Sequence, residues 1–571
     1  MIRETWDELE TGEKVGRMMF KSVRFADDQA LFSQSARGLP ALDDTLYKRC
    51  EENGMRIKDK KTKAMRFYKP SRASKLRLKS SATALRCVIS FIVNSGDAAS
   101  EKAGLGVLVS IERHSQSRPV GFRASVWQYL LHFNRPTLFE MDRKNRQQWI
   151  KDVLAKQIVD TYLPWKGSQI AGCDVEHIEG KKDNFASTTY AITIRLRKGE
   201  GGSEEYLSQS LFLKFIVDEQ VVREALHSEN QFHNEIMWYS KVVPRFDSLI
   251  KEAGIRDWNC DIFPKCFYAY YDVDDAVVAL EDLRPKKFQL GDRYCLDVKH
   301  VEKALETIAR SHALAYKWRE VDGESFNEVA GSFKESTLNE QLDDTLKACN
   351  SRVMKALEKD PAYKDRLLKF QEITVNPYKL MRFFAKPKNN LATLCHGDFC
   401  RNNMLFSEGS ENGNSTVDIK LIDFQTVRYA SPAIDLSFFF FLSTTPEFRA
   451  KEFDRLFDLY HNTLLKTLKA LSPKEKPEYI KNLENVFSLQ AFKDDFAKHA
   501  VYGYFITAFF LPVMLVDDKT REEMSQLWEA NDDRHVEMLA NMGGENVTKQ
   551  LVETLKEVLD RGYWPILENK V

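Results

Sequence analysis

The sequence lacks several features that would place it in a special class of protein. It has no excess charge, because 84 Lys and Arg residues balance 84 Asp and Glu residues among 571, so no overall attraction to nucleic acid or anionic lipid is expected. Its nine cysteines form no C-x-x-C pair, which disfavours a zinc site and is typical of free thiols in a reducing compartment. No repeat of 20–50 residues is present, so a solenoid is excluded.

Long hydrophobic runs are also scarce. Residues 1–10 are polar and lack the apolar centre of a signal peptide. The longest apolar run, 500–516, contains Gly503 and Pro512 and is just short of a comfortable span, so it predicts a buried helix rather than a membrane-spanning one. We therefore expect a cytoplasmic protein without a membrane partner, and we expect a monomer.

The chain divides into regions that differ in how regularly apolar residues recur along the sequence. Residues 1–68 and 69–141 are weakly patterned, whereas amphipathic stretches and aromatic residues from 142 onward indicate globular structure. Strand-like runs concentrate before residue 283, and helical periodicity dominates after it. This order predicts an α+β fold in which a small β-rich lobe, 142–283, joins a large helical lobe, 284–571.

The elements expected in these lobes can be placed by residue range. Helices are expected at 143–160, 222–243, 298–320, 336–358 and 366–383, the second of them ending at Pro244. Strands are expected at 188–197, 210–217, 262–271, 276–281, 393–396, 404–406 and 419–422. The remainder of the chain to Val571 is expected to be helical.

One stretch departs from the charge balance. Residues 56–79 include eleven basic residues and a single acid, Asp59, which gives a net charge of +10. Such a run can bind a phosphate backbone, but a solvated linker explains it as well and is the interpretation that we favour. We therefore do not expect a nucleic-acid partner, and a salt-dependent mobility shift would test this alternative.

The densest group of chemistry-bearing residues is the run HGDFCRNN, from His396 to Asn403. Asp398 precedes Asn403 by five residues, and Asp423 follows Asp398 by 25 residues in the run LIDF. Phosphoryl transfer needs one carboxylate that accepts the proton of the attacking hydroxyl and further oxygen ligands that hold Mg²⁺ on nucleotide phosphates. Either motif alone is common in loops, but their combined order and spacing predict a kinase site.

Partners for the nucleotide phosphates are expected upstream. Lys214 lies in the apolar strand LFLKF and Glu235 lies 21 residues later in an apolar helical pattern, so we expect the two to pair. A snorkelling edge lysine and a surface glutamate are the alternatives. A phosphate-binding loop is expected before the strand of Lys214, and the candidate is the run GKKDNFAS at 180–187, which has a single glycine. We expect the backbone groups of Asn184, Phe185 and Ser187 in this loop to bind phosphate.

Two more segments complete the expected site. In the connection between the lobes, backbone groups expected to meet the adenine edge belong to Leu280, Glu281, Asp282 and Leu283. Asp435 begins a very apolar helix in the run SPAIDL, where a buried acid needs hydrogen-bond donors. We expect Asp435 to brace the backbone of the loop that holds His396 and Asp398, and a helix cap is the alternative role.

Residues 142–571 resemble the ecdysteroid kinase-like family, also called CHK kinase-like, of the aminoglycoside phosphotransferase and choline kinase superfamily. The shared motifs are HGDFCRNN, LIDFQ with SPAIDL, VALEDL, and NEIMWYSKVVP around Glu235. The resemblance implies a bilobal protein-kinase-like fold and phosphorylation, with ATP and Mg²⁺, of a hydroxyl group on an ecdysteroid or another lipophilic or xenobiotic alcohol. It further implies that Asp398 is the catalytic base and that Asn403 and Asp423 bind the metal. A catalytically inactive nucleotide- or ligand-binding protein is the alternative, which the complete residue set argues against.

Within residues 1–68, the segment 17–68 is similar to a different class of protein. The run VRFADDQALF, with Asp27 and Asp28, resembles the palm hairpin of a non-LTR retroelement reverse transcriptase. Because the fragment has no room for fingers, thumb or the other palm carboxylate, it excludes an active polymerase, and neither aspartate is expected to function. We interpret the segment as a mobile-element remnant or a mis-joined gene segment, followed by a linker of uncertain structure at 69–141.

Overall fold

The computed structural model divides the chain into two units, Met1–Pro136 and Thr137–Val571, and each is described by itself. In the first unit the structure describes five short strands. In the second it describes residues 143–563 except for 179–186, 199–204, 218–222, 224–226, 257, 259, 273–274, 339, 341, 412–413, 473–476 and 530–533.

The described part of the first unit is a hairpin and a small sheet. Its strands are β1 (Val23–Phe25), β2 (Asp28–Ala30), β3 (Lys75–Arg77), β4 (Arg86–Ile92) and β5 (Gly106–Glu112). β1 pairs antiparallel with β2, and β3, β4 and β5 form a three-stranded antiparallel sheet. Asp27 and most of the basic run at 56–79 lie outside the described residues.

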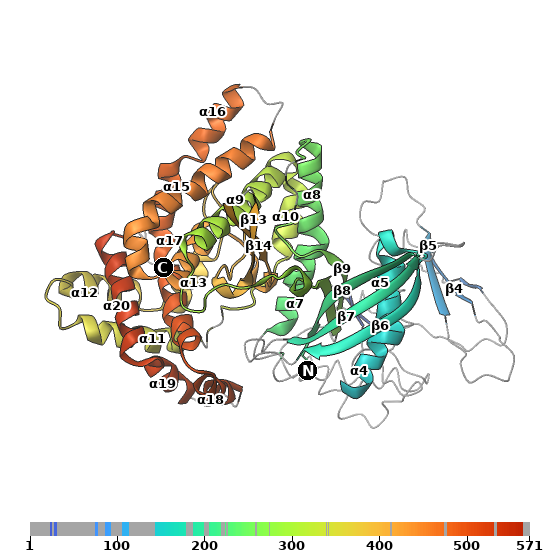
Figure 1. Ribbon diagram of the computed structural model, residues 1–571, viewed down its shortest axis with the longest axis horizontal. Coiled ribbons are helices and arrows are strands. Elements are labelled where there is room, and N and C mark those ends of the chain that lie inside the picture. Colours follow the sequence, from blue (N-terminus) through green and yellow to red (C-terminus); the bar gives the residue numbers. More distant parts are fainter. Residues whose placement is uncertain are drawn as a thin grey trace. The chain divides into compact units, whose positions relative to one another are not determined.

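A five-stranded antiparallel sheet forms the small lobe of the second unit (Figure 1). Its strands, in spatial order, are β6 (Gln169–Ile178), β7 (Ser187–Lys198), β8 (Glu205–Ile216), β10 (Asp275–Glu281) and β9 (Cys266–Asp272). The sequence did not predict β6, because this edge strand is largely solvent-exposed and its apolar alternation is weak.

The two faces of this sheet bury different side chains. Tyr190, Ile192 and Ile194 of β7 point to the outer face, where a helix packs over them. That helix consists of α4 (Arg143–Trp149), the π-helical turn η3 (Ile150–Leu154) and α5 (Ala155–Thr161). The opposite face carries Lys214 of β8, and it is the face from which the site is built.

A second helix of the small lobe runs further than the sequence predicted. α7 (Ser228–Met237) continues through a π-helical turn, η5 (Trp238–Val242), into α8 (Val243–Glu252). Pro244 does not end the helix, because the π-helical turn η5 precedes it and the helix continues into α8, of which Pro244 is the second residue. The start predicted at Val222 lies outside the described residues.

The large lobe is mostly helical, as the sequence predicted. Its helices are α9 (Val298–Val321), α10 (Gly323–Ser332), α11 (Leu342–Leu357), α12 (Lys364–Ile373), α13 (Pro377–Phe384), α14 (Ala433–Ser443), α15 (Pro446–Ala470), α16 (Pro477–Val486), α17 (Leu489–Leu515), α18 (Asp518–Glu529), α19 (Arg534–Asn541) and α20 (Gly544–Asp560). The helix predicted at 336–358 begins only at Leu342. The one predicted at 366–383 is two helices, because Asn376 caps a new helix that starts at Pro377.

The most apolar helices of this lobe pack against each other. The stretch Pro477–Leu515 is long and apolar enough to cross a membrane, but 72% of its most apolar window is buried. Within it, Gly503 of α17 lies so close to α14 that an added Cβ would be 2.4 Å from the backbone carbon of Ser437. The apolarity of this helix is therefore accounted for by its packing inside the lobe.

Short strands in the large lobe carry the loops of the site. They are β11 (Gln289–Leu290), β12 (Thr393–Cys395), β13 (Met404–Glu411), β14 (Asn414–Leu421) and β15 (Arg428–Ala430). β13 and β14 form a hairpin longer than the predicted strands at 404–406 and 419–422, and β12 pairs antiparallel with β15. This pairing brings the start of the run HGDFCRNN next to the segment that follows Asp423.

Candidate active site

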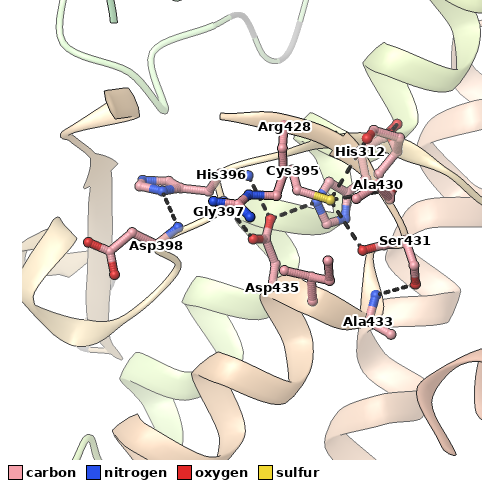
Figure 2. Close-up of polar contacts among 12 residues, drawn as sticks. His312, Cys395, His396, Gly397, Asp398, Arg428, Ala430, Ser431, Ala433 and Asp435 are labelled. Carbon is pink, nitrogen blue, oxygen red and sulfur yellow. Dashed lines mark hydrogen bonds and ion pairs between the residues drawn. The ribbon is translucent and has the colours of Figure 1, made fainter. Parts of the chain in front are cut away.

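One buried carboxylate holds the loop that carries the predicted catalytic residues. Asp435, in the first turn of α14, has no exposed surface. Its Oδ2 accepts a hydrogen bond from the backbone N–H of His396 at 2.7 Å, and its Oδ1 accepts one from that of Gly397 at 2.8 Å (Figure 2). Both oxygens are thus directed to the loop, so Asp435 braces the loop rather than capping its own helix.

Two residues that the sequence did not single out support this carboxylate. His312 of α9 places Nε2 at 3.2 Å from Asp435 Oδ2, and its Nδ1 lies 2.9 Å from the hydroxyl of Tyr460 on α15. Because the carboxylate only accepts, the ring donates to it from Nε2, and Nδ1 shares a hydrogen bond with the tyrosine hydroxyl. No local motif could have identified them, since His312 is 123 residues from Asp435 and 148 from Tyr460.

A buried thiol lies beside this network. Cys395 is close enough to His312 and Asp435 for the three to hold a metal ion geometrically. However, burial raises the pKa of the Cys395 thiol well above its usual value, and the thiol donates to the backbone carbonyls of Ala430 and Ser431. A thiol binds metal as a thiolate, so we assign this group to hydrogen bonding rather than to metal binding.

Gly397 is required by the shape of the loop. Its φ is +83°, and a Cβ built on it would lie 2.0 Å from the backbone oxygen of Thr426. The hydroxyl of Thr426 also donates to the carbonyl of His396 at 3.1 Å. The loop therefore touches the segment after Asp423 along its backbone, and only glycine fits at this position.

Asp398 and Asn403 meet at the end of the braced loop. Asn403 Nδ2 donates to Asp398 Oδ2 at 2.8 Å and to the Asp398 carbonyl at 2.9 Å. The Cys400 thiol donates to Asp398 Oδ1 at 3.6 Å. Burial raises the pKa of the Asp398 carboxyl, with His396 opposing this shift and the charge of Asp423 adding to it.

Asp423 enters the site from the end of β14. It has a left-handed backbone, with φ of +67°, and precedes the 3₁₀ turn η8 (Phe424–Thr426). His396 Nε2 lies 2.9 Å from the carbonyl of Ile422 and therefore ties the two loops together. Because an aspartate rarely adopts this conformation, the surrounding contacts must hold it there.

A lysine of the small lobe links both lobes. Lys214 Nζ donates to Glu235 Oε2 at 2.8 Å and to Asp423 Oδ1 at 2.7 Å. Burial alone would lower the pKa of Lys214, but the charges of Asp423 and Glu235 outweigh it and raise the pKa, so the ammonium stays protonated. Burial raises the pKa of Glu235 against the charge of Lys214.

The connection between the lobes follows β10 directly. The N–H of Glu281 donates to Lys265 O at 2.8 Å, and that of Asp282 donates to Ser210 O at 3.2 Å. The Leu283 carbonyl accepts from two later residues of the turn. Leu280 pairs with Phe212 inside the sheet.

A cavity of about 400 Å³ opens beside this connection. It is lined by Asp174, Val175, Glu176, Ala191, Thr193, Ser210, Asp282, Arg284 and Pro285. Thr193 and Ser210 are neighbours on adjacent strands with hydroxyls 3.2 Å apart, and Ser210 shares its face of β8 with Lys214 because side chains alternate along a strand. The cavity and Lys214 thus lie along one face of the sheet.

The predicted phosphate loop is only partly described. Asn184 and Phe185 lie outside the described residues. Ser187 is the first residue of β7 and pairs with Ile216, and two residues later Thr189 pairs with Lys214. The start of β7, which the predicted loop leads into, is therefore the end of the strand nearest to Lys214.

The side chains that converge here fit a magnesium ion. Asp423 offers a carboxylate whose side chain is 30% exposed. The amide nitrogen of Asn403 donates to Asp398, so its Oδ1 is the atom that could act as an oxygen ligand. Such oxygen ligands are those that Mg²⁺ prefers, together with substrate phosphates. These two residues would hold the ion, and its charge would screen the phosphates of a nucleotide.

The β-rich and helical lobes, with a buried lysine–glutamate pair facing an Asp–Asn–Asp set, define a kinase-like protein. A family model of the ecdysteroid kinase-like family matches residues 181–472, which is more than half of the chain. The protein therefore belongs to the ecdysteroid kinase-like family, and at the level of the family it is a kinase-like small-molecule phosphotransferase. No curated protein matches the chain.

Proposed function

We propose that this protein transfers the γ-phosphoryl group of ATP, with Mg²⁺, to a hydroxyl group of an ecdysteroid or a related lipophilic alcohol. The observation that carries the proposal is the contact of Lys214 with both Glu235 and Asp423, because it joins the small lobe to the catalytic loops. The choice of acceptor rests on the family match. The free thiols of the cysteines between Cys173 and Cys400 agree with a cytoplasmic location, and we propose a monomer.

The nucleotide is proposed to lie along the face of the sheet that carries Lys214. Its base would occupy the cavity beside the connection, which Asp282 and Arg284 help to line. Its phosphates would reach Lys214, whose raised pKa keeps a full positive charge available for them. The loop that contains Asn184, Phe185 and Ser187 would cover the phosphates from the start of β7.

The acceptor hydroxyl is proposed to bind next to Asp398. Asn403 holds one carboxylate oxygen through its amide, and the other oxygen can accept the hydroxyl proton. As the acceptor oxygen bonds to the γ-phosphorus, the bond from that phosphorus to the bridging oxygen breaks and ADP leaves. A carboxyl with a raised pKa is a better base than an ordinary one, and the brace from Asp435 fixes where it points.

The decisive experiment is transfer of radiolabelled phosphate from Mg·ATP to a panel of ecdysteroids, other steroid alcohols and xenobiotic alcohols. Labelled organic phosphate should form with the full-length protein, and Asp398→Asn should lower its rate by about 10³-fold. The matched control is Asp418→Asn, an aspartate with a 77% exposed side chain on β14. Binding of Mg·ATP without transfer to any alcohol would favour the inactive binding protein instead.

A further inference from the structure

The residue next to Glu235 makes an unusual set of contacts. Asn234 of α7 has no exposed surface. Its Nδ2 donates to the backbone carbonyl of Lys334 at 2.8 Å and to that of Gln425 at 2.9 Å, while its Oδ1 accepts from the N–H of Lys334 at 2.9 Å. Only an amide satisfies two acceptors and one donor in this way.

Both partners belong to the large lobe. Lys334 lies in the segment 333–338 between α10 and α11, which we name the strap. Asn230 of α7 donates to the Glu335 carbonyl at 2.9 Å, and the Ser336 hydroxyl donates to the Gln425 carbonyl at 3.0 Å. The strap, α7 and the turn after Asp423 therefore meet at a single carbonyl oxygen.

The strap is itself fixed to the large lobe. Glu335 forms an ion pair with Arg382 of α13 at 3.0 Å, and its other oxygen accepts from the N–H groups of Thr337 and Leu338. Leu338 and Ser336 are buried. The contacts of Asn234 thus connect a helix of the small lobe to a rigid part of the large lobe, across 100 and 191 residues of sequence.

We infer that Asn234 is a positioning residue that holds Glu235, and through it Lys214, in place for the nucleotide before any nucleotide binds. α7 carries Glu235, and the same amide that anchors α7 also fixes the carbonyl two residues after Asp423. Neutral, buried hydrogen bonds are not screened by salt and do not depend on a bound cation. The inference rests on the proposed function for its consequence in catalysis. The three hydrogen bonds of Asn234, which we call the clamp, involve only residues of this chain.

The test compares Asn234→Leu with Thr554→Val in the full-length protein. Leucine has the same branched arrangement of heavy atoms but makes none of the three hydrogen bonds. Thr554 is a buried residue of α20 that accepts from Arg449 away from the site. Hydrogen exchange of residues 228–237 is measured without nucleotide, and Mg·ATP affinity is measured by calorimetry. In Asn234→Leu, hydrogen exchange of α7 should become about ten-fold faster, and the affinity for Mg·ATP should fall about ten-fold. Each change corresponds to about one net hydrogen bond.

The control separates positioning from general stability. Thr554→Val should lower the melting temperature while leaving the exchange of α7 and the Mg·ATP affinity unchanged. Equal exchange of α7 in Asn234→Leu and the unmodified protein would overturn the inference. If Asn234→Leu does not fold, Ser336→Ala removes one of the two donors to the Gln425 carbonyl and should give a smaller change in the same direction. If the unmodified protein binds no Mg·ATP, the proposed function fails. The comparison of hydrogen exchange still shows whether the hydrogen bonds of Asn234 hold α7 in place.

Discussion

The two halves of the candidate site are held by different forces. In the large lobe, Asp398 lies on a loop fixed through its backbone, by the carboxylate of Asp435 and by the close approach of Gly397 to Thr426. In the small lobe, Lys214 is held by two charged partners, Glu235 and Asp423. Hydrogen bonds to the backbone fix one geometry, whereas an ammonium can exchange one carboxylate for a phosphate.

This difference suggests a division of roles. The fold sets the geometry of the loop half. A base needs such a fixed geometry, because it must lie within hydrogen-bond distance of the hydroxyl that it deprotonates. The lysine half can reorganise, because Asp423 is bound to Lys214 here and would have to turn toward a cation when the nucleotide enters. Variants in the loop half should therefore affect stability and activity together, and variants in the lysine half should affect nucleotide use above all.

The largest effect is expected from Asp435→Ala. This change leaves the N–H groups of His396 and Gly397, and the ring of His312, without their buried acceptor. We expect a loss of about 3–5 kcal/mol in the free energy of unfolding, measured by urea denaturation. Asp418→Ala, at an exposed aspartate, is the control and should change it by less than about 0.5 kcal/mol. A loss as small as the control's would show that the loop does not depend on this brace.

Lys214→Met should have the next largest effect. We expect this variant to change the use of the nucleotide more than the stability of the fold. Because Lys214 is the proposed partner of the nucleotide phosphates, removing its ammonium should lower kcat/KM for Mg·ATP by about 10²–10³-fold. Lys303→Met is the matched control, because Lys303 is a partly exposed lysine with only a distant acidic partner at 3.8 Å. If the acceptor KM rose while the kinetics for Mg·ATP stayed unchanged, the division of roles would be wrong.

A single methyl group tests the close approach in the loop. Gly397→Ala places a Cβ against the Thr426 carbonyl on a backbone with φ of +83°. The strain should lower the free energy of unfolding by about 2 kcal/mol and reduce turnover. Gly323→Ala is the control, because a Cβ at Gly323 would meet nothing within 4 Å. Equal stability of the two variants would contradict the close approach.

The sequence predicted the parts of this site that lie within short motifs. Asp398 and Asn403 are five residues apart and Asp423 follows in a second motif, so spacing alone indicated their chemistry. The lobe order followed from apolar periodicity, which changes from strand-like to helical near residue 283. The contacts that hold the site could not be predicted, because the hydrogen bonds that link the His312 ring, Tyr460 and the strap to the site join residues 89 or more positions apart in the chain. Pro244 misled the helix prediction, since a π-helical turn before it lets the helix continue.

The smallest effect expected is a gain in stability when the Asp398 carboxyl, the proposed base, is replaced by an amide. Burial raises the pKa of Asp398 above its unfolded value, so the folded state binds the proton more tightly than the unfolded state does. Stability from this group is complete below the unfolded pKa and is lost as the pH rises through the folded pKa. Asp398→Asn carries no charge, so it should be more stable than the unmodified protein by about 1 kcal/mol at pH 7.

The same reasoning gives the pH dependence of that gain. The difference in unfolding free energy should shrink toward zero as the pH falls to about 4, where the carboxyl of the unmodified protein is increasingly protonated. Urea denaturation of both proteins between about pH 4 and pH 8 measures it, and Asp418→Asn should show no such gain. A difference that is constant with pH would mean that the ionised Asp398 carries no cost in the folded state. The loop would then stabilise the ionised carboxylate of Asp398 as well as water does. The contrast in stability between the loop half and the lysine half of the site would then not extend to Asp398.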